Sequence, residues 1–252
     1  MFRILRACLF SLVVGPVIAA HASPPGVPNI VLVHGAFADG SSWERVIPLL
    51  QQQGYHVTAA QLPLTSLADD VAATRRAIGR QSGNVLLVGH SWAGVVVTEA
   101  GNADTVKGIV YLSAMVPDSG ESATGMLMRF SAPMEGMTPD AGGLIWLDDP
   151  TVFRNVMGAD LPMSTARVLA AVGKPIAARA FADPVGHAAW HDKPTWYLVT
   201  EHDHALPPGV QRRIAAQLHA QTMTLKSSHL SLVAYPRLVA DFIGRAAAGA
   251  GR

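Results

Sequence analysis

A serine at a sharp turn is the residue of this sequence best placed to do chemistry. The apolar run Val85–Val88 leads directly into residues 89–94, Gly-His-Ser-Trp-Ala-Gly, with Ser91 at the apex. Small neighbours are needed there, because the serine backbone is strained and the following helix must pass close to the strand. The turn aims the hydroxyl at a helix N-terminus, where backbone N–H groups stabilise negative charge. Ser91 is therefore the predicted nucleophile.

A serine hydroxyl reacts slowly until a base removes its proton, and the base in turn needs an orienting carboxylate. His229 follows the last apolar run of the chain, and Asp203 follows the run Thr195–Thr200. These residues are the predicted base and acid. Asp203 could instead be only a turn residue that caps the next helix. Asp118 is the main alternative acid.

The elements that must position these residues alternate regularly along the chain. Short β-branched runs that read as buried strands are separated by segments of helical period. We predict a doubly wound α/β domain with a mostly parallel sheet of about six strands, whose ligands sit at the carboxyl ends of the strands. The predicted strands are Asn29–His34, Val57–Ala60, Val85–Val88, Val106–Leu112, Thr195–Thr200 and Thr222–Leu225. The predicted helices are Trp43–Gln53, Leu67–Gln81, Ser91–Ala100, Pro208–Ala220 and Pro236–Ala248.

Residues 119 to about 192 interrupt this alternation. Proline and glycine are frequent there, no strand run appears, and the segment holds Met126, Met128, Met134, Met137, Met157 and Met163. We interpret it as a small inserted cap, mainly helical. Flexible methionines near aromatic residues suit an adaptable apolar pocket wall, although such residues also simply pack a cap onto its domain. The predicted pocket residues are Phe37, Trp92, Met126, Phe130, Trp146 and Leu230.

Composition and the N-terminus restrict the class of protein. Half of the 252 residues are hydrophobic, 15% are charged and the formal net charge is +1, so no basic surface for nucleic acid is expected. Residues 1–22 combine two arginines, an apolar run and an Ala-x-Ala ending, which indicates a signal peptide cleaved between Ala22 and Ser23. An uncleaved anchor is the alternative, disfavoured by the run's length. The mature protein, residues 23–252, is expected to be periplasmic or secreted, without stable membrane insertion.

Neither a metal nor another cofactor is expected. The single cysteine, Cys8, lies in the signal segment, so the mature chain has no thiolate ligand, thiol nucleophile or disulfide. His187 and His191 are four residues apart, and His202 and His204 flank Asp203. However, no His-Glu-x-x-His signature or phosphate-binding glycine loop accompanies them.

The turn around Ser91 resembles the nucleophile elbow of the α/β-hydrolase superfamily, usually Gly-x-Ser-x-Gly. Ala93 departs from that pattern, but alanine is nearly as small and Gly94 follows. Residues 34–43, 62–70, 110–118 and 194–199 are similar to the bacterial relatives of plant methylesterases and hydroxynitrile lyases. The resemblance covers nearly all of residues 29–243.

The resemblance implies the chain order nucleophile, acid, base, which Ser91, Asp203 and His229 follow. It also implies an oxyanion hole formed by the backbone amides of Ala36 and Trp92, and a small cap over an apolar pocket. Members act mainly as esterases on small or aromatic esters. The lyases place a lysine directly after the catalytic histidine, where this sequence has Leu230.

We therefore expect a carboxylesterase that cleaves small to medium, neutral, hydrophobic or aromatic esters through an acyl-enzyme. Hydroxynitrile-lyase-like or other non-hydrolytic chemistry on the same triad is one alternative. A catalytically silent binding protein of the same fold is the other. The sequence does not identify the natural ester.

Overall fold

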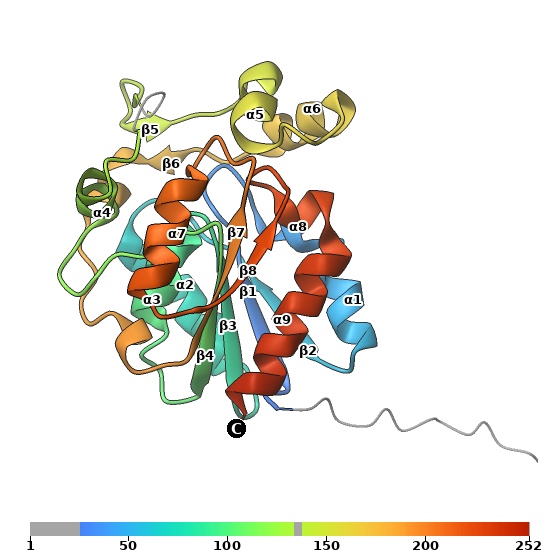
Figure 1. Cartoon of the computed structure of the whole chain (residues 1–252). Coiled ribbons are helices and arrows are strands. Elements are labelled where there is room, and N and C mark those ends of the chain that lie inside the picture. The colour runs from blue at the N-terminus through green and yellow to red at the C-terminus, as the bar shows by residue number, and fades with distance from the viewer. Residues whose placement is uncertain (1–25, 134–137, 252) are drawn as a thin grey trace, which may run out of the picture.

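Six short apolar runs form a single parallel sheet in the computed structural model, which describes residues 26–133 and 138–251 (Figure 1). The strand order is β2-β1-β3-β4-β7-β8, and every neighbouring pair is parallel. The strands are β1 (Asn29–Val33), β2 (His56–Ala60), β3 (Val85–His90), β4 (Val106–Leu112), β7 (Thr195–Thr200) and β8 (Gln221–Leu225). The predicted fold class is confirmed.

Helices cover both faces of the sheet, because its central strands are apolar on both sides. In β1, Val31 and Val33 face one core while Ile30 and Leu32 face the other. Helices α2, α3 and α7 pack on the first face, and α1 and α9 on the second (Figure 1). Their bounds are α1 (Ile47–Gln52), α2 (Leu67–Gly79), α3 (Ala93–Ala100), α7 (Pro208–Gln217), α8 (Ser231–Ala234) and α9 (Pro236–Ala250).

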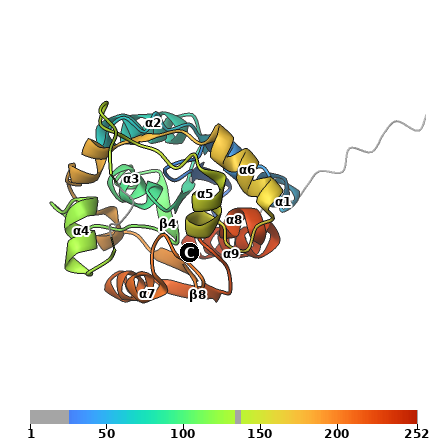
Figure 2. The same cartoon turned by 90° about the horizontal axis from the view of Figure 1, so that it is seen from above.

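The segment between β4 and β7 lies across the end of the sheet at which the strands finish (Figures 1 and 2). It contains the helices α4 (Ala123–Arg129), α5 (Pro150–Met157) and α6 (Met163–Val172), with the short 3-10 helices η2 (Ala178–Ala182) and η3 (Ala189–His191). We call α5, α6 and the loop between them the α5–α6 cap. Figure 2 shows α5 above the centre of the sheet.

Two local details differ from the sequence prediction. The expected helix Trp43–Gln53 is divided into the 3-10 helix η1 (Gly40–Trp43), which Asp39 caps, and α1, whose first turn contains Pro48. The inserted segment also contains a short antiparallel pair, β5 (Leu144–Ile145) with β6 (Ile176–Ala177). Strands of two residues are too short to produce an alternating pattern in the sequence.

The expected signal peptide, and two of the methionines assigned to the cap, Met134 and Met137, lie outside the described residues. Within the described residues, no helix is both long enough and apolar enough to cross a bilayer.

Candidate active site

Ser91 stands between β3 and α3 in a strained backbone conformation. Its φ of 55° lies in the left-handed region that non-glycine residues rarely adopt. The Ser91 amide donates to the Leu112 carbonyl (3.1 Å), and the Ser91 carbonyl accepts from the amides of Gly94 (2.9 Å) and Met115 (3.2 Å). These three bonds hold the turn that presents the hydroxyl.

Glycine is required on both sides of this turn because backbone segments meet there. A Cβ on Gly94 would lie 2.2 Å from the Met115 carbonyl oxygen, and one on Gly89 would lie 2.8 Å from that of Ala93. Ala93 lies between these glycines as the first residue of α3, and its methyl group is fully buried. The departure from the usual motif therefore falls at a position that the fold accommodates.

Asp203 and His229, which lie beyond the ends of β7 and β8, are directly bonded. The two carboxylate oxygens of Asp203 accept hydrogen bonds from five donors. These are His229 Nδ1 (2.7 Å), Thr200 Oγ1 (2.7 Å), Gln211 Nε2 (2.8 Å) and the amides of Ala205 and Leu206 (2.8 Å each). Burial by itself raises the pKa of Asp203, but the paired His229 and these donors lower it below its ordinary value. Asp203 is therefore held as a carboxylate.

Asp118, the alternative acid, lies elsewhere. Its side chain is half exposed, and its Oδ1 lies 2.7 Å from Nε2 of His191 on the surface. Of the two carboxylates considered from the sequence, only Asp203 is bonded to His229.

His229 is positioned through its backbone as well as its ring. Its carbonyl accepts from His90 Nε2 (3.0 Å) and from Ser113 Oγ (3.3 Å). Because Nδ1 donates its proton to Asp203, Nε2 is the basic nitrogen of the neutral ring. Nε2 is buried and has no hydrogen-bond partner within the described part of the chain. The structure records no hydrogen bond between Ser91 and this nitrogen, a contact that often forms only with substrate bound.

Two further histidines around the site are buried and neutral. Burial lowers the pKa of His90 to about 3 and that of His34 to about 4. His34 Nε2 accepts from the Leu62 amide (3.0 Å), so its Nδ1 carries the proton and donates to the Gly35 carbonyl (2.9 Å). Both rings serve as structural hydrogen-bonding groups in the loops that surround Ser91.

The two expected oxyanion donors, the amides of Ala36 and Trp92, make no hydrogen bond to any acceptor in residues 26–133 and 138–251. The loop carrying Ala36 contacts the elbow directly, since a Cβ on Gly35 would lie 2.9 Å from Cβ of Ser91. The next residue, Phe37, has a φ of 59°. This geometry leaves both N–H groups available beside Ser91.

A narrow apolar cavity lies between these loops and the α5–α6 cap. Its volume is about 20 Å³, enough for roughly one water molecule. Its apolar walls are formed by Phe37, Phe153, Met157, Leu169, Val172, Leu230 and Val233. Asp39, Ser41 and Ser42 form a polar side of the cavity. The three proposed catalytic residues are not in its lining, but Leu230 directly follows His229. Two of the expected pocket residues, Phe37 and Leu230, therefore line this cavity.

The other four expected pocket residues lie elsewhere. Trp92 is fully buried, with its indole N–H donating to Asp70 (2.8 Å). The Met126 sulfur accepts from the Val116 amide (3.2 Å). Phe130 lies under the guanidinium of Arg129, 4.3 Å from the ring centroid. Trp146 is 46% exposed and bonds Asp140.

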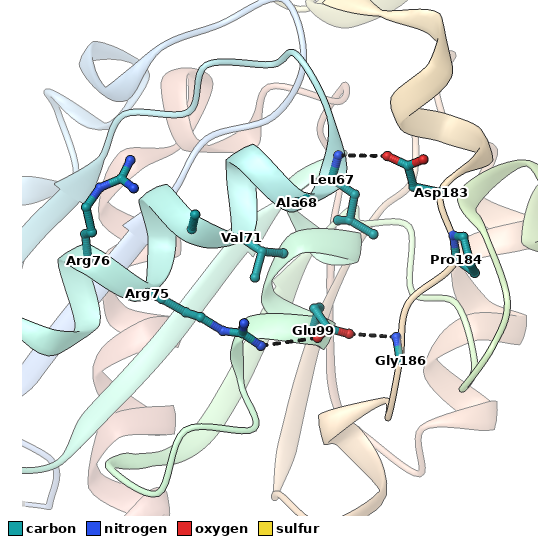
Figure 3. A pocket seen from close by; sticks show the side chains of 10 residues that line it. Leu67, Ala68, Val71, Arg75, Arg76, Glu99, Asp183, Pro184 and Gly186 are labelled. Atoms are coloured by element: carbon teal, nitrogen blue, oxygen red, sulfur yellow. Dashed lines mark hydrogen bonds and ion pairs between the residues drawn. The ribbon is translucent and has the colours of Figure 1, made fainter.

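A larger open hollow, of about 840 Å³, lies outside α2 and contains none of the three proposed catalytic residues (Figure 3). In it Arg75 pairs with Glu99 (3.2 Å), which also accepts from the Gly186 amide (2.7 Å). These interactions join α2 and α3 to the segment before β7.

Three of the four histidines considered for metal binding have other side-chain hydrogen-bond partners. His187 pairs with Asp192 (2.6 Å) and His191 with Asp118, while His204 Nδ1 lies 2.8 Å from the Asn155 carbonyl. Among the described residues, no group of three or more histidine, cysteine, aspartate or glutamate side chains is arranged to hold a metal ion.

Several residues that build the site were not identified from the sequence, including Asp70, Ser113, Thr200 and Gln211. Asp70 carries a usable signal, because it falls on the apolar stripe of α2 together with Leu67, Val71 and Ile78. A charged residue on such a stripe requires a buried partner. The others follow no local pattern.

Comparison with known proteins identifies the family of the chain. The model of the alpha/beta hydrolase family matches residues 30–242, and the chain belongs to that family. An alpha/beta hydrolase of Aspergillus novofumigatus, nvfD, is 28% identical over 243 residues, covering 87% of this chain and 96% of the relative. Methylesterase 8 of Arabidopsis thaliana is 28% identical over 122 residues, covering 42% and 44%.

A solved extracellular alpha/beta-hydrolase from a Paenibacillus species has the same fold, with a TM-score of 0.75 at 20% identity, covering 86% of this chain and 98% of its own length. The expected relationship is confirmed: the protein is an α/β-hydrolase relative of the plant methylesterases. Relatives named as hydrolases and esterases support a hydrolytic enzyme.

Proposed function

We propose that this protein is a serine carboxylesterase that uses Ser91, His229 and Asp203. The observation that carries the proposal is the buried His229–Asp203 pair, with Nδ1 bonded to the carboxylate at 2.7 Å and Nε2 left without a partner in the described residues. This arrangement fixes the tautomer in which Nε2 can accept the Ser91 proton.

In the acylation step, Ser91 Oγ attacks the ester carbonyl while His229 Nε2 accepts its proton. Asp203 orients the imidazole ring and stabilises its charged form. The hydrogen bonds that Asp203 accepts keep its carboxylate ionised for this role. The amides of Ala36 and Trp92 donate to the tetrahedral oxyanion. His229 then protonates the departing alkoxide, leaving an acyl-enzyme.

In the deacylation step, His229 removes a proton from water, which attacks the acyl carbon. The bond between the acyl carbon and Ser91 Oγ then breaks, and His229 returns the proton to Oγ as the acid leaves. Each half-reaction uses the same base and the same oxyanion donors. Loss of one such donor in other hydrolases costs about 3 to 4 kcal/mol of transition-state stabilisation. The chemistry requires no cofactor.

We propose neutral, hydrophobic or aromatic esters of small to medium size as substrates. The apolar part of the narrow cavity's wall, which includes Phe37, Met157 and Leu230, supports this class. The ionisable residue in the lining, Asp39, is acidic and accepts a hydrogen bond from the Ser41 amide (2.7 Å), so the lining offers no cation to an anionic substrate. In this proposal the α5–α6 cap moves to admit substrate, because the cavity's volume of about 20 Å³ holds no more than about one water molecule.

Leu230 also favours hydrolysis over cyanohydrin cleavage. The residue after His229 is apolar, 3% exposed and part of the cavity wall, so it supplies no positive charge to stabilise a cyanide leaving group. A silent binding protein is disfavoured because the strained Ser91 and a buried, fully hydrogen-bonded Asp203 have a stability cost that ligand binding alone does not require.

The experiment that tests the function is hydrolysis of p-nitrophenyl acetate, butyrate and octanoate by the purified protein, beside Ser91→Ala and His229→Ala variants shown by circular dichroism to be folded. We expect turnover by the wild type and its loss in both variants. Turnover that persists in folded Ser91→Ala would contradict the proposal.

We also propose that the protein is exported, on the basis of the leader pattern in residues 1–22. Expression of the full chain in a bacterial host, followed by N-terminal sequencing of the periplasmic fraction, tests this. Export predicts a chain starting at Ser23, and an uncleaved chain retained with the membranes contradicts it.

A further inference from the structure

A buried tryptophan–aspartate bond lies directly behind the proposed oxyanion hole. The indole Nε1 of Trp92 donates to Oδ2 of Asp70 (2.8 Å), and both residues are fully buried. The other carboxylate oxygen, Oδ1, accepts from the Leu64 amide (2.8 Å). Asp70 lies on α2, so this bond joins the elbow residue to a helix from a separate part of the chain.

The peptide unit between Ser91 and Trp92 is restrained at both ends. Its carbonyl, that of Ser91, accepts from the amides of Gly94 and Met115. Its other end, at the Cα of Trp92, is restrained through the side chain by Asp70. In a trans peptide the N–H points opposite to the C=O, so these restraints together fix the direction of the Trp92 N–H.

The buried carboxyl group of Asp70 carries a desolvation cost that packing alone does not explain. Burial raises the pKa of Asp70, while hydrogen bonds from Trp92 and Leu64 and the charge of Lys174 oppose that rise. An apolar residue would fill the same place on the apolar stripe of α2 without the desolvation penalty. Phe181 already packs against the Trp92 ring, 5.0 Å between centroids, so the ring does not need Asp70 to be buried.

We propose that Asp70 is a positioning residue for the oxyanion hole, which acts through the indole of Trp92 to hold the Trp92 amide in the direction that the tetrahedral oxyanion requires. The inference rests on the proposed esterase function. Asp70 touches neither substrate nor Ser91, and its effect is on the transition state rather than on the bound ester.

The test is Trp92→Phe, which keeps an aromatic ring and removes the N–H donor. The Trp92 amide remains in this variant but loses one restraint. We therefore expect kcat for p-nitrophenyl butyrate to fall about tenfold, which is a smaller decrease than the loss of an oxyanion donor would cause. KM should stay within about twofold of the wild-type value. The affinity for an arylboronic acid, which forms a tetrahedral adduct on Ser91, should fall by a similar factor. Asp70→Asn leaves a single acceptor oxygen, which cannot serve both the Trp92 indole and the Leu64 amide, and should act in the same direction.

Trp190→Phe is the matched control. Its indole also donates a single bond, to the Pro117 carbonyl (3.0 Å), but Trp190 lies on η3 and contributes no atom to the peptide unit between Ser91 and Trp92. Wild-type kcat and boronate affinity are expected for this variant. In the double variant Trp92→Phe/Asp70→Asn, the loss in kcat should match that of one single variant rather than the product of both, since one bond accounts for both effects.

The proposal is overturned if both Trp92→Phe and Asp70→Asn keep the wild-type kcat and boronate affinity while unfolding at lower urea concentration. That result would show that the bond between Trp92 and Asp70 has only a structural role. If Trp92→Phe does not fold, Asp70→Asn gives the same readouts. An active wild type with unaffected variants would overturn this inference alone. A folded wild type that hydrolyses none of the esters and binds no boronate would overturn the proposed function with it.

Discussion

Nδ1 of His229 lies 2.7 Å from Oδ2 of Asp203, although the two residues belong to loops after different strands. The pair is buried, and Asp203 receives four further hydrogen bonds that stabilise its negative charge. The acid is therefore fixed in place before any substrate binds, and the imidazole is oriented by it.

Replacement of Asp203 tests this orientation. In Asp203→Asn the amide no longer fixes the tautomer of His229, so we expect kcat to fall about 10⁴-fold with the fold retained. Asp118→Asn, at the exposed carboxylate bonded to His191, should stay within about twofold of wild type because surface pairs contribute little. The reverse ranking in p-nitrophenyl butyrate assays would assign the acid to Asp118.

The size of the narrow cavity should control acyl-chain preference. Met157→Ala removes part of its cap-side wall, so we expect the ratio of kcat/KM for octanoate to that for acetate to rise about tenfold. The change should also lower the free energy of unfolding by about 2 to 5 kcal/mol. Val152→Ala, on the exposed side of the same helix, is the control and should leave the ratio unchanged. An unchanged ratio in Met157→Ala would place the acyl chain elsewhere.

Stability should fall as the pH drops from about 6.5 toward 4. His34 and His90 have folded-state pKa values of about 4 and about 3, below the ordinary value of 6.5. In this range the unfolded chain binds protons that the folded chain does not, so each histidine contributes up to about 1.4 kcal/mol per pH unit. Urea unfolding at pH 7.0 and 5.0 measures the difference.

His90→Gln should reduce that pH dependence by up to the contribution of one histidine. His56→Gln, which replaces an exposed histidine, is the control. Equal pH dependence in the wild type and in His90→Gln would show that His90 is not held neutral in the folded protein.

The sheet was predictable because its four inner strands are short apolar runs, mostly buried on both faces, and the two edge strands are short runs at the matching spacing along the chain. Ser91 was predictable because a strand, a tight turn and small residues are adjacent in the sequence. Asp203 and His229 could be proposed because both follow strands that end at the same edge. Asp70 and Gln211 could not be assigned from local pattern, since their partners come from other elements.

The pocket was the least predictable part of the site. Phe37 directly follows Ala36, and Leu230 directly follows His229. Their place in the cavity wall could therefore be predicted from their neighbours in the sequence. Phe153 and Met157 reach the cavity only through the way the α5–α6 cap packs over the sheet. Trp146 and Phe130 have the same apolar character but lie on other surfaces of the segment, because composition does not encode the direction of a side chain.

The most direct test of the account is covalent labelling of the protein with a fluorophosphonate, with the modified residue located by peptide mass spectrometry. Activation of Ser91 by the His229–Asp203 pair predicts one label per chain on the peptide that contains Ser91, and strongly slowed labelling in folded His229→Ala. A folded wild type that remains unlabelled, or that carries the label on another residue, would contradict the assignment of Ser91 as the nucleophile.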